Sequence, residues 1–265
     1  MLERWLGDNL LLFGLAQALA AAGLSLLIVT VARYLNISLF RDSVTALLRG
    51  LVQVVAVGFV LLLILQSSLW VALPVLAFMA FFAATIAARR AKGIPDVFSV
   101  SLMGIALGAG AVILVMTWLG VIDNSLAAII PVGSMLVANA MNTSSLFFNR
   151  LLSEVEAHVG QIEAGLSLGA ASSTVVAPYI QAAVEASLIP RIDSIRSLGL
   201  VWIPGVMTGL ILAGDDPVYA GIYQLAVMAM IFASAALTSI ITSLLVRRRL
   251  FSPAEQLLVR AKDGV

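Results

Sequence analysis

Seven stretches of this chain are apolar over about 18 residues or more, with few or no charged side chains. An α-helix needs about 20 such residues to cross the hydrocarbon core of a bilayer. The predicted spans are Asn9 to Ala32, Val44 to Leu65 (starting after Arg49 if no charge is allowed), Leu69 to Ala88, Val97 to Leu119, Ser125 to Phe148, Ser197 to Gly214 and Val218 to Val246. The sequence therefore predicts an all-α, polytopic membrane protein with about seven transmembrane helices in a single domain, residues 1–265.

The composition excludes an ordinary soluble domain. The chain is 62% hydrophobic and 11% charged, and its mean hydropathy is +1.09. A net charge of +1 gives no sign of a nucleic-acid partner, and the absence of cysteine excludes a thiolate metal site. The first apolar segment is too long for a cleaved signal peptide, so we expect a retained anchor.

The basic residues indicate how the chain is oriented. With seven spans the termini lie on opposite sides, and every Lys and Arg except Arg4 then falls on the side of the C-terminus. Cytoplasmic loops carry the excess of Lys and Arg in membrane proteins. We expect the N-terminus outside and the C-terminus in the cytoplasm, in a bacterial inner membrane or plasma membrane.

One long polar insert, residues 150–196, separates the fifth predicted span from the sixth. It holds three arginines, the sole histidine and five acidic residues. Because a charge at the bilayer centre costs about 2.5 kcal/mol or more, we expect the insert to face the cytoplasm. Apolar residues recur in it at helical spacing. We predict two or three helices at the membrane surface, broken between Gly169 and Ser173 and ended by Pro190.

The sixth predicted span contains a proline. Its sequence, LGLVWIPGVMTGLILAG, places Pro204 beside Gly205 in the middle of a short helix. Short spans, and spans interrupted by Pro or Gly, point to the substrate site in transporters. Glycines four apart also occur, as in Gly104 with Gly108, and permit close approach of helices either within the chain or at a dimer face.

The predicted spans hold neutral polar residues, and no span has a charge at its centre. In the fifth span, Asn139, Asn142 and Thr143 are three and four residues apart and share one helical face. A polar path could be completed by Gln53, Thr208 and Gln224. The alternative is plain hydrogen bonding between helices, typically about 0.6 kcal/mol per contact.

Metal chemistry has weak support in the residues themselves. Met141 and Met207 suit soft metals but also fill packing gaps. His158 and Glu154, four apart, could be two metal ligands, although a lone histidine among glutamates is more typical of a solvated helix face. The motifs of metalloproteases, serine hydrolases and phosphate-binding loops are absent from the sequence. An energy source for transport would therefore lie in another subunit.

Several stretches resemble one family of membrane subunits. EAGLSLG, from Glu163 to Gly169, is similar to the loop of ABC-transporter subunits in which a Glu-Ala pair precedes a glycine and a coupling helix lies in a groove of the ATPase. PVGSMLVANAMNTSSLFFNRL, from Pro131, and IPGVMTGLILAG, up to Gly214, resemble the FetB family of ABC permease subunits. The similarity runs through most of the chain from Leu47 onward.

The resemblance implies a permease domain that works with a separate ATP-binding subunit. Bacterial members of the family are linked to iron export, with ATP and Mg bound by the partner and no cofactor in the permease. Plant relatives are linked to aluminium tolerance, and nucleotide-sugar transport has been proposed for them. One chain is half of such a device, so a homodimer surrounded by membrane lipid is expected.

The resemblance also implies functional residues. Ala138 replaces a usual Gly, Val206 a Met and Leu210 a Gln. If the usual Gln touches the substrate, the change at Leu210 implies a cargo other than the one typical of the family. The implied substrate-pathway residues are Asn139, Met141, Asn142, Met207 and Thr208; the implied helix break is Pro204, Gly205 and Gly209; and the implied ATPase-coupling residues are Glu163, Ala164, Gly169, Ala170 and Ser172.

Other functions stay open on the sequence alone. The chain could be an ABC permease for a nucleotide sugar or another organic solute. A passive channel would conduct without a partner subunit. An intramembrane enzyme would need an acid, base or metal constellation at membrane depth, and the sequence offers none.

Overall fold

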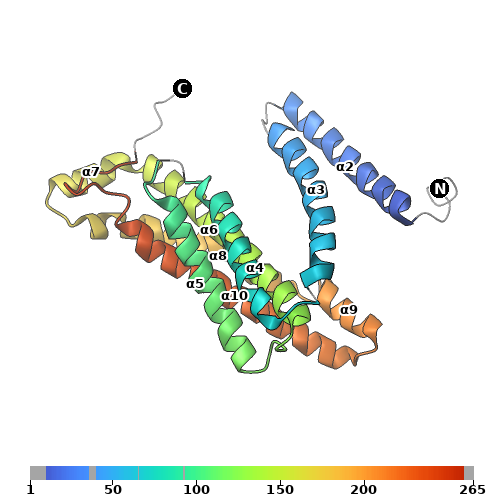
Figure 1. The fold of residues 1–265 in the computed structure, drawn as a ribbon. Coiled ribbons are helices and arrows are strands. Elements are labelled where there is room, and N and C mark those ends of the chain that lie inside the picture. Colours follow the sequence, from blue (N-terminus) through green and yellow to red (C-terminus); the bar gives the residue numbers. More distant parts are fainter. Residues whose placement is uncertain (1–9, 36–39, 65, 92, 260–265) are drawn as a thin grey trace. The chain divides into compact units, whose positions relative to one another are not determined.

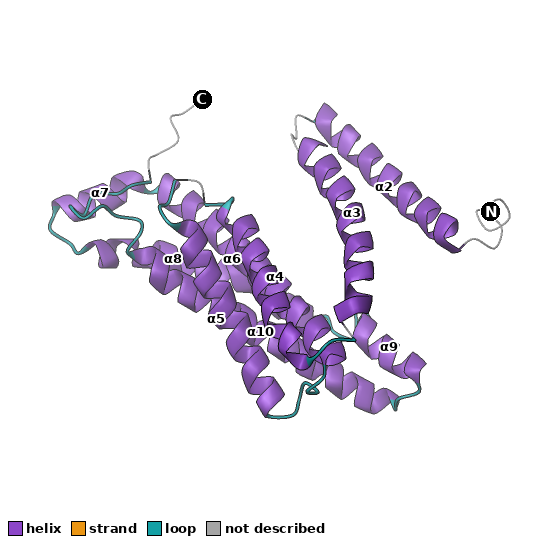
Figure 2. Cartoon of the chain, viewed as in Figure 1, coloured by secondary structure: helices purple, strands orange, loops and turns teal. Residues whose placement is uncertain are grey.

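The computed structural model describes residues 10–35, 40–64, 66–91 and 93–259. Every regular element among them is a helix, apart from two isolated single-pair bridges, which confirms the all-α prediction (Figure 2). The chain divides into two compact units, Met1–Ser67 and Ser68–Val265. Arg4, the basic residue expected to lie outside, is not among the described residues.

The first unit consists of two long apolar helices. α2 spans Leu10–Tyr34 and α3 spans Phe40–Ile64, and within this unit they lie side by side (Figure 1). Their apolar side chains, such as Leu27 and Phe59, are exposed. Both helices are long and apolar enough to cross a membrane, as the first two predicted spans require.

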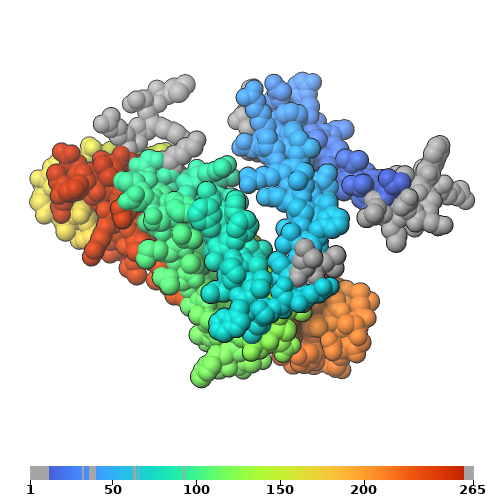
Figure 3. Space-filling model, in the orientation of Figure 1, coloured from blue at the N-terminus to red at the C-terminus, as the bar shows by residue number. Residues whose placement is uncertain are grey.

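The second unit is a helical bundle. It comprises a 3₁₀ turn at Leu69–Val71, α4 (Ala72–Ala88), α5 (Val97–Trp118), α6 (Leu126–Ala157), α7 (Val159–Ser167), α8 (Ser172–Arg196), α9 (Gly205–Ala213) and α10 (Pro217–Arg247). Helices α4, α5, α6, α8 and α10 run alongside one another (Figure 1). On the face drawn in Figure 3, the side chains of α4 and α5 pack against each other.

Close packing of α5 on α10 depends on two glycines. A Cβ atom on Gly104 would lie 2.3 Å from the hydroxyl of Thr242, and one on Gly108 would lie 2.1 Å from the hydroxyl of Thr238. Both distances are far inside van der Waals contact. The predicted close helix approach is thus confirmed for the Gly104 and Gly108 pair.

Six helices among the described residues are long and apolar enough to be membrane spans. The sixth predicted span, from Ser197 to Gly214, is not one continuous helix: residues 197–204 are not helical, and α9 contains only nine residues. Pro204 is the extended N-cap of α9 (φ −71°, ψ 147°). The expectation of a proline in mid-helix was therefore wrong, because proline fits readily at a helix start, where its missing N–H is not needed.

The polar insert also folds differently from the prediction. The break at Gly169 is confirmed, since α7 ends at Ser167 and Gly169 has a φ of +83°. Pro190 does not end a helix, however, because α8 continues through it to Arg196. Instead of lying wholly beyond the spans, α8 packs along α6 and α10.

An apolar core holds the insert to the end of the bundle where α6 and α10 finish. Ile162 of α7 and Val176 of α8 are fully buried there, in one cluster with Phe147, Leu151 and Val246. Burying such a side chain contributes about 1.5–3 kcal/mol. The turn between α7 and α8 therefore projects from a firmly packed base.

Candidate functional site

Helix α8 reaches far into the bundle. Its Ser187 hydroxyl lies 2.9 Å from that of Ser239 on α10. Near its C-terminal end, Arg191 shares a cavity with Met135 of α6 and Gln224 of α10. At about 1.5 Å per residue, Met135 lies about 14 Å from the start of α6, and Gln224 about 10 Å from the start of α10. The end of α8 therefore lies alongside α6 and α10, both of which are long and apolar enough to cross a membrane, and not beyond their ends.

The outer face of α8 carries a polar stripe. The exposed positions recur every three or four residues. Five of them are polar or charged (Thr174, Gln181, Glu185, Asp193 and Arg196), and two are apolar (Pro178 and Ile189). Two pairs within the stripe interact, with Gln181 donating to Glu185 at 3.1 Å and Arg196 lying 3.8 Å from Asp193. By contrast, the exposed residues of α5 and α10 are largely apolar, as in Leu114 and Ile240. A stripe of this kind cannot be stable against lipid tails.

On its opposite face α8 borders a cavity of about 220 Å³ between α6, α9 and α10. The cavity is lined by Met135, Asn139, Arg191, Ser194, Trp202, Pro204, Gly205, Val206, Gln224, Met228 and Ile231. Arg191 is the charged member of this lining. Its buried Nε atom has no hydrogen-bond partner among the described residues. The cavity therefore presents an uncompensated positive charge.

Neutral amides complete the polar part of the cavity. Asn139 donates to the carbonyl oxygen of Met135 at 2.8 Å, one helical turn back. The side-chain oxygen of Gln224 accepts from the backbone N–H of Met207 at 3.3 Å, which ties α9 to α10. Each amide nitrogen has two N–H groups, so donors remain for a ligand.

The structure brings together only part of the residues expected in the substrate pathway and helix break. Asn139, Pro204 and Gly205 line the cavity, and Met207 adjoins it through Gln224. The remaining predicted members, Met141, Asn142, Thr208 and Gly209, do not line it. Asn142 and Thr208 are exposed, and the Thr208 hydroxyl donates to the carbonyl oxygen of Pro204 at 3.1 Å.

Sequence reasoning missed Arg191, because the whole insert was expected to face water. The expectation that no span has a charge at its centre concerned the seven predicted spans, none of which includes residue 191. A signal was present in the spacing: Val176, Ile180, Ala183 and Ser187 are buried at helical intervals, and residue 191 continues that row. Because Pro190 was expected to end the helix, the continuation of this buried row to residue 191 was not predicted.

The turn between α7 and α8 forms a different kind of surface. Gly160, Glu163, Ala164 and Ser167 are exposed on one face of α7, and Leu168 at its tip is 89% exposed. The other predicted coupling residues, Gly169, Ala170 and Ser172, follow directly, the first two exposed and Ser172 partly buried. The small side chains of this segment leave its backbone accessible to a partner, and the exposed Leu168 adds apolar surface.

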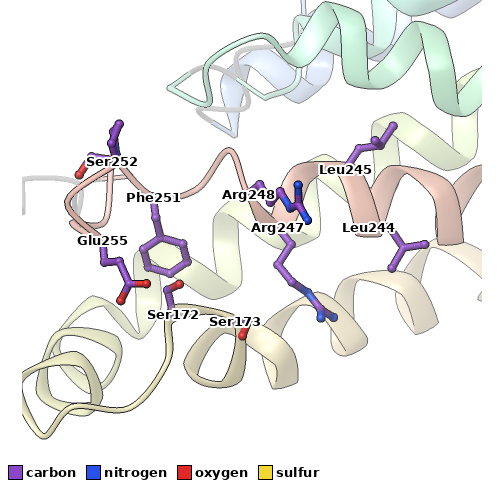
Figure 4. A pocket seen from close by; sticks show the side chains of 10 residues that line it. Ser172, Ser173, Leu244, Leu245, Arg247, Arg248, Phe251, Ser252 and Glu255 are labelled. Atoms are coloured by element: carbon purple, nitrogen blue, oxygen red, sulfur yellow. The ribbon is translucent and has the colours of Figure 1, made fainter.

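Beside this turn lies a larger cavity of about 650 Å³ (Figure 4). Ser172 and Ser173, at the start of α8, face Arg247 and Arg248, at the end of α10, across it. The C-terminal segment closes it with Phe251, Ser252, Pro253 and Glu255. The segment is itself held in place, because the N–H of Leu258 donates to the carbonyl oxygen of Leu250 at 2.9 Å.

His158 is engaged in local structure. Its Nδ1 lies 2.8 Å from the backbone carbonyl oxygen of Glu154, and its ring stacks on Tyr179 at 4.9 Å. Within the described residues, no group of three or more His, Cys, Asp or Glu side chains is placed to hold a metal.

A family model described as "Uncharacterised protein family (UPF0014)" matches residues 15–251. The chain belongs to the UPF0014 family. The matched region includes the cavity around Arg191, the polar stripe and the turn between α7 and α8. These features therefore lie in the part of the chain that the UPF0014 family shares.

Relatives in this family come from bacteria and plants. The chain is 35% identical over 241 residues to "Probable iron export permease protein FetB" of Escherichia coli, covering 89% of this chain and 93% of that protein. It is 30% identical over 246 residues to "Protein ALUMINUM SENSITIVE 3" of Arabidopsis thaliana, covering 92% and 90%. It is 35% identical over 224 residues to "UPF0014 membrane protein YjkA" of Bacillus subtilis, covering 82% and 87%. No solved structure matches the chain.

Together, these findings establish a multi-pass membrane protein of the UPF0014 family. The apolar helices have the length and composition of membrane spans, and the bacterial relatives are named as a permease and a membrane protein. The resemblance to the FetB family is thereby confirmed.

Proposed function

We propose that this chain is the membrane-spanning permease subunit of an ABC transporter that exports iron or another metal ion, with ATP and Mg bound by a separate subunit. The name of the Escherichia coli relative supports the kind of cargo. The coupling role of the α7–α8 turn rests on its resemblance to the loop of ABC permeases that docks on an ATPase.

The polar stripe of α8 is the observation that carries a transport function. Gln181, Glu185 and Asp193 are exposed on a helix that packs lengthwise against two membrane spans. Polar side chains at membrane depth face a bundle interior or a water-filled cavity. The stripe is therefore proposed as one wall of a hydrated path.

A second copy of the chain supplies the opposite wall in this proposal. A single bundle leaves the stripe uncovered on its outer side, whereas a two-fold axis beside α8 would place two stripes around a shared space. Alternating access would then widen this space first toward one side of the membrane and then toward the other.

The proposed topology keeps seven crossings. α8 and α9 together form one crossing, broken at residues 197–204, as in transporters whose discontinuous helices meet near the substrate. The N-terminus is then outside and the C-terminus in the cytoplasm. Arg150, Arg247, Arg248 and Arg249 lie at the cytoplasmic end, which agrees with the excess of positive charge expected there.

The ATP-binding subunit is proposed to dock at the turn between α7 and α8. The exposed face of α7 and the tip residue Leu168 supply the contact. The apolar core beneath, which includes Ile162 and Val176, would pass movement of the turn to α6, α8 and α10.

Because the sequence contains no cysteine, single introduced cysteines can test the path without background. Glu185→Cys and Asp193→Cys should react with a membrane-impermeant thiol reagent in intact membranes. Ile240→Cys is the matched control, since Ile240 follows Ser239, the partner of Ser187, and is exposed and apolar. Equal protection of all three cysteines would contradict a hydrated path along α8.

A second measurement distinguishes a pump from a channel. Iron efflux from liposomes that contain the chain and its ATPase should require ATP hydrolysis. Flux from the chain alone, independent of ATP, would instead support a passive channel.

A further inference from the structure

We propose that the cavity around Arg191 binds an oxyanion group, a carboxylate or a phosphate. The cargo would then reach this site as an anion, or as a metal held by an anionic chelator, and not as a bare cation. This inference rests on the transport function proposed above and names the chemical class of its cargo.

The position of Arg191 on α8 directs it inward. Ala183 and Ser187 are fully buried against the bundle, and Arg191 takes the next place on that face, one turn further on. Arg191 therefore lines the cavity with Asn139 and Gln224. It lies on the side of the helix opposite to the polar stripe.

The cavity lies alongside the apolar part of α10 and not at its end. The lining residues Gln224 and Met228 lie about 10 and 16 Å from the start of α10, at about 1.5 Å per residue. A charge kept at this depth costs free energy, and such residues generally mark substrate or ion pathways.

The charge of Arg191 is not neutralised within the described part of the chain. The cavity lining contains no acidic residue. Asp193, two residues away, lies on the exposed stripe near Arg196, and Glu185 accepts a hydrogen bond from Gln181. A bare metal cation would be repelled here, whereas an oxyanion can accept paired hydrogen bonds from the guanidinium.

Neighbouring groups favour the same ligand. Asn139 and Gln224 retain N–H donors, and α9 begins at the cavity with Gly205. The start of a helix adds partial positive charge. The volume of about 220 Å³ is below the roughly 300 Å³ typical of sites for larger ligands. The cavity therefore suits a small oxyanion, and a whole nucleotide sugar would need a wider space.

The test measures binding of citrate and of inorganic phosphate to the purified full chain in phosphatidylcholine nanodiscs by isothermal titration calorimetry. At least one anion should bind, and Arg191→Gln should weaken that binding about tenfold or more. Arg191→Lys keeps the charge but loses the paired hydrogen bonds, so it should retain more of the binding than Arg191→Gln does. Arg196→Gln is the matched control, since Arg196 lies on the exposed stripe, and should bind as the wild type does.

A second variant guards against loss of folding in Arg191→Gln. Gln224→Glu keeps the oxygen that accepts from Met207 and places a carboxylate in the cavity with Arg191. This variant should fold normally and lose anion binding, because its own carboxylate pairs with the guanidinium.

Several outcomes would overturn the inference: no anion binding by the wild type, unchanged binding in Arg191→Gln, or tighter binding of Fe²⁺ chloride than of either anion. Competition by added phosphatidylglycerol would assign the oxyanion site to a lipid headgroup and would overturn its assignment to the cargo. No ATPase is present in this measurement. Its failure therefore leaves the ATPase partnership standing, and failure of ATPase assembly leaves the binding result standing.

Discussion

The hydroxyl of Ser239 on α10 donates a hydrogen bond to the hydroxyl of Ser187 on α8, across 2.9 Å in the bundle interior. The direction follows because Ser187 donates its own proton to the carbonyl oxygen of Val184 at 2.7 Å, and a hydroxyl has one proton to donate. Both serines are fully buried. The bond joins the helix that carries the polar stripe to the last membrane span.

Replacing one serine of this pair should lower the free energy of unfolding by more than that serine's share of the loss in the double variant. In Ser187→Ala the buried hydroxyl of Ser239 loses its acceptor, whereas the Ser187→Ala, Ser239→Ala double variant leaves no unpaired group. A double-mutant cycle on unfolding should give a coupling of about 0.6 kcal/mol, typical of helix contacts in membranes. Strictly additive effects would show that the bond contributes nothing.

Gly108→Ala should destabilise the second unit. A Cβ there would lie 2.8 Å from the backbone nitrogen of Thr238 and 2.9 Å from its Cα, so α5 and α10 must separate, at a cost of about 1–3 kcal/mol. Gly110→Ala is the control, because its Cβ would meet open space. Thermal unfolding in detergent should show a lower midpoint for Gly108→Ala only. Equal midpoints would contradict this close packing.

Changes at the turn between α7 and α8 should prevent assembly with the ATPase. Glu163→Lys reverses the charge on the exposed face of α7, and Gly169→Trp adds bulk where φ is +83°. Each should lower the yield of co-purified ATPase by about tenfold or more, with normal insertion into the membrane.

The control for this experiment is Asp215→Lys, the same kind of charge reversal beside the start of α10. It should leave ATPase recovery unchanged. Normal recovery with both turn variants would count against docking at this turn.

Asp216→Ala should weaken the start of α10. One carboxylate oxygen of Asp216 accepts from the N–H groups of Val218 and Tyr219 at 2.9 and 3.0 Å, and loss of such a cap costs about 1 kcal/mol. Asp215→Ala lacks this effect because Asp215 is not the cap. Chemical unfolding should separate the two variants, and equal stability would show that the cap is dispensable.

The membrane spans could be predicted because the signal is local. Each of Leu69–Ala88 and Val97–Trp118 carries its apolar character within its own residues, so length and hydropathy suffice. The helix break at Gly169 could also be predicted, because the helical spacing of apolar residues is interrupted beside it. The expectations of one permease domain and of seven crossings stay predictions.

The candidate site could be predicted only in part. Asn139, Pro204 and Gly205 stood out as polar or helix-breaking residues within apolar sequence, and they line the cavity. Asn142 did not join them. A helix rotates by about 100° per residue, so Asn142 does not point in the same direction as Asn139, and its side chain is exposed. Equal spacing on one helix does not say which side a neighbouring helix will cover.

By itself, the sequence determined that this chain is a helical membrane protein, because the free energy of placing apolar side chains in lipid is a sum over neighbouring residues. Only the tertiary structure decided that α8 lies within the bundle and that Arg191 faces a cavity. A polar helix is stable at membrane depth only if residues distant in the sequence pack against it and pair with its polar groups. Here Ser239 and Gln224, far along the chain, supply that environment.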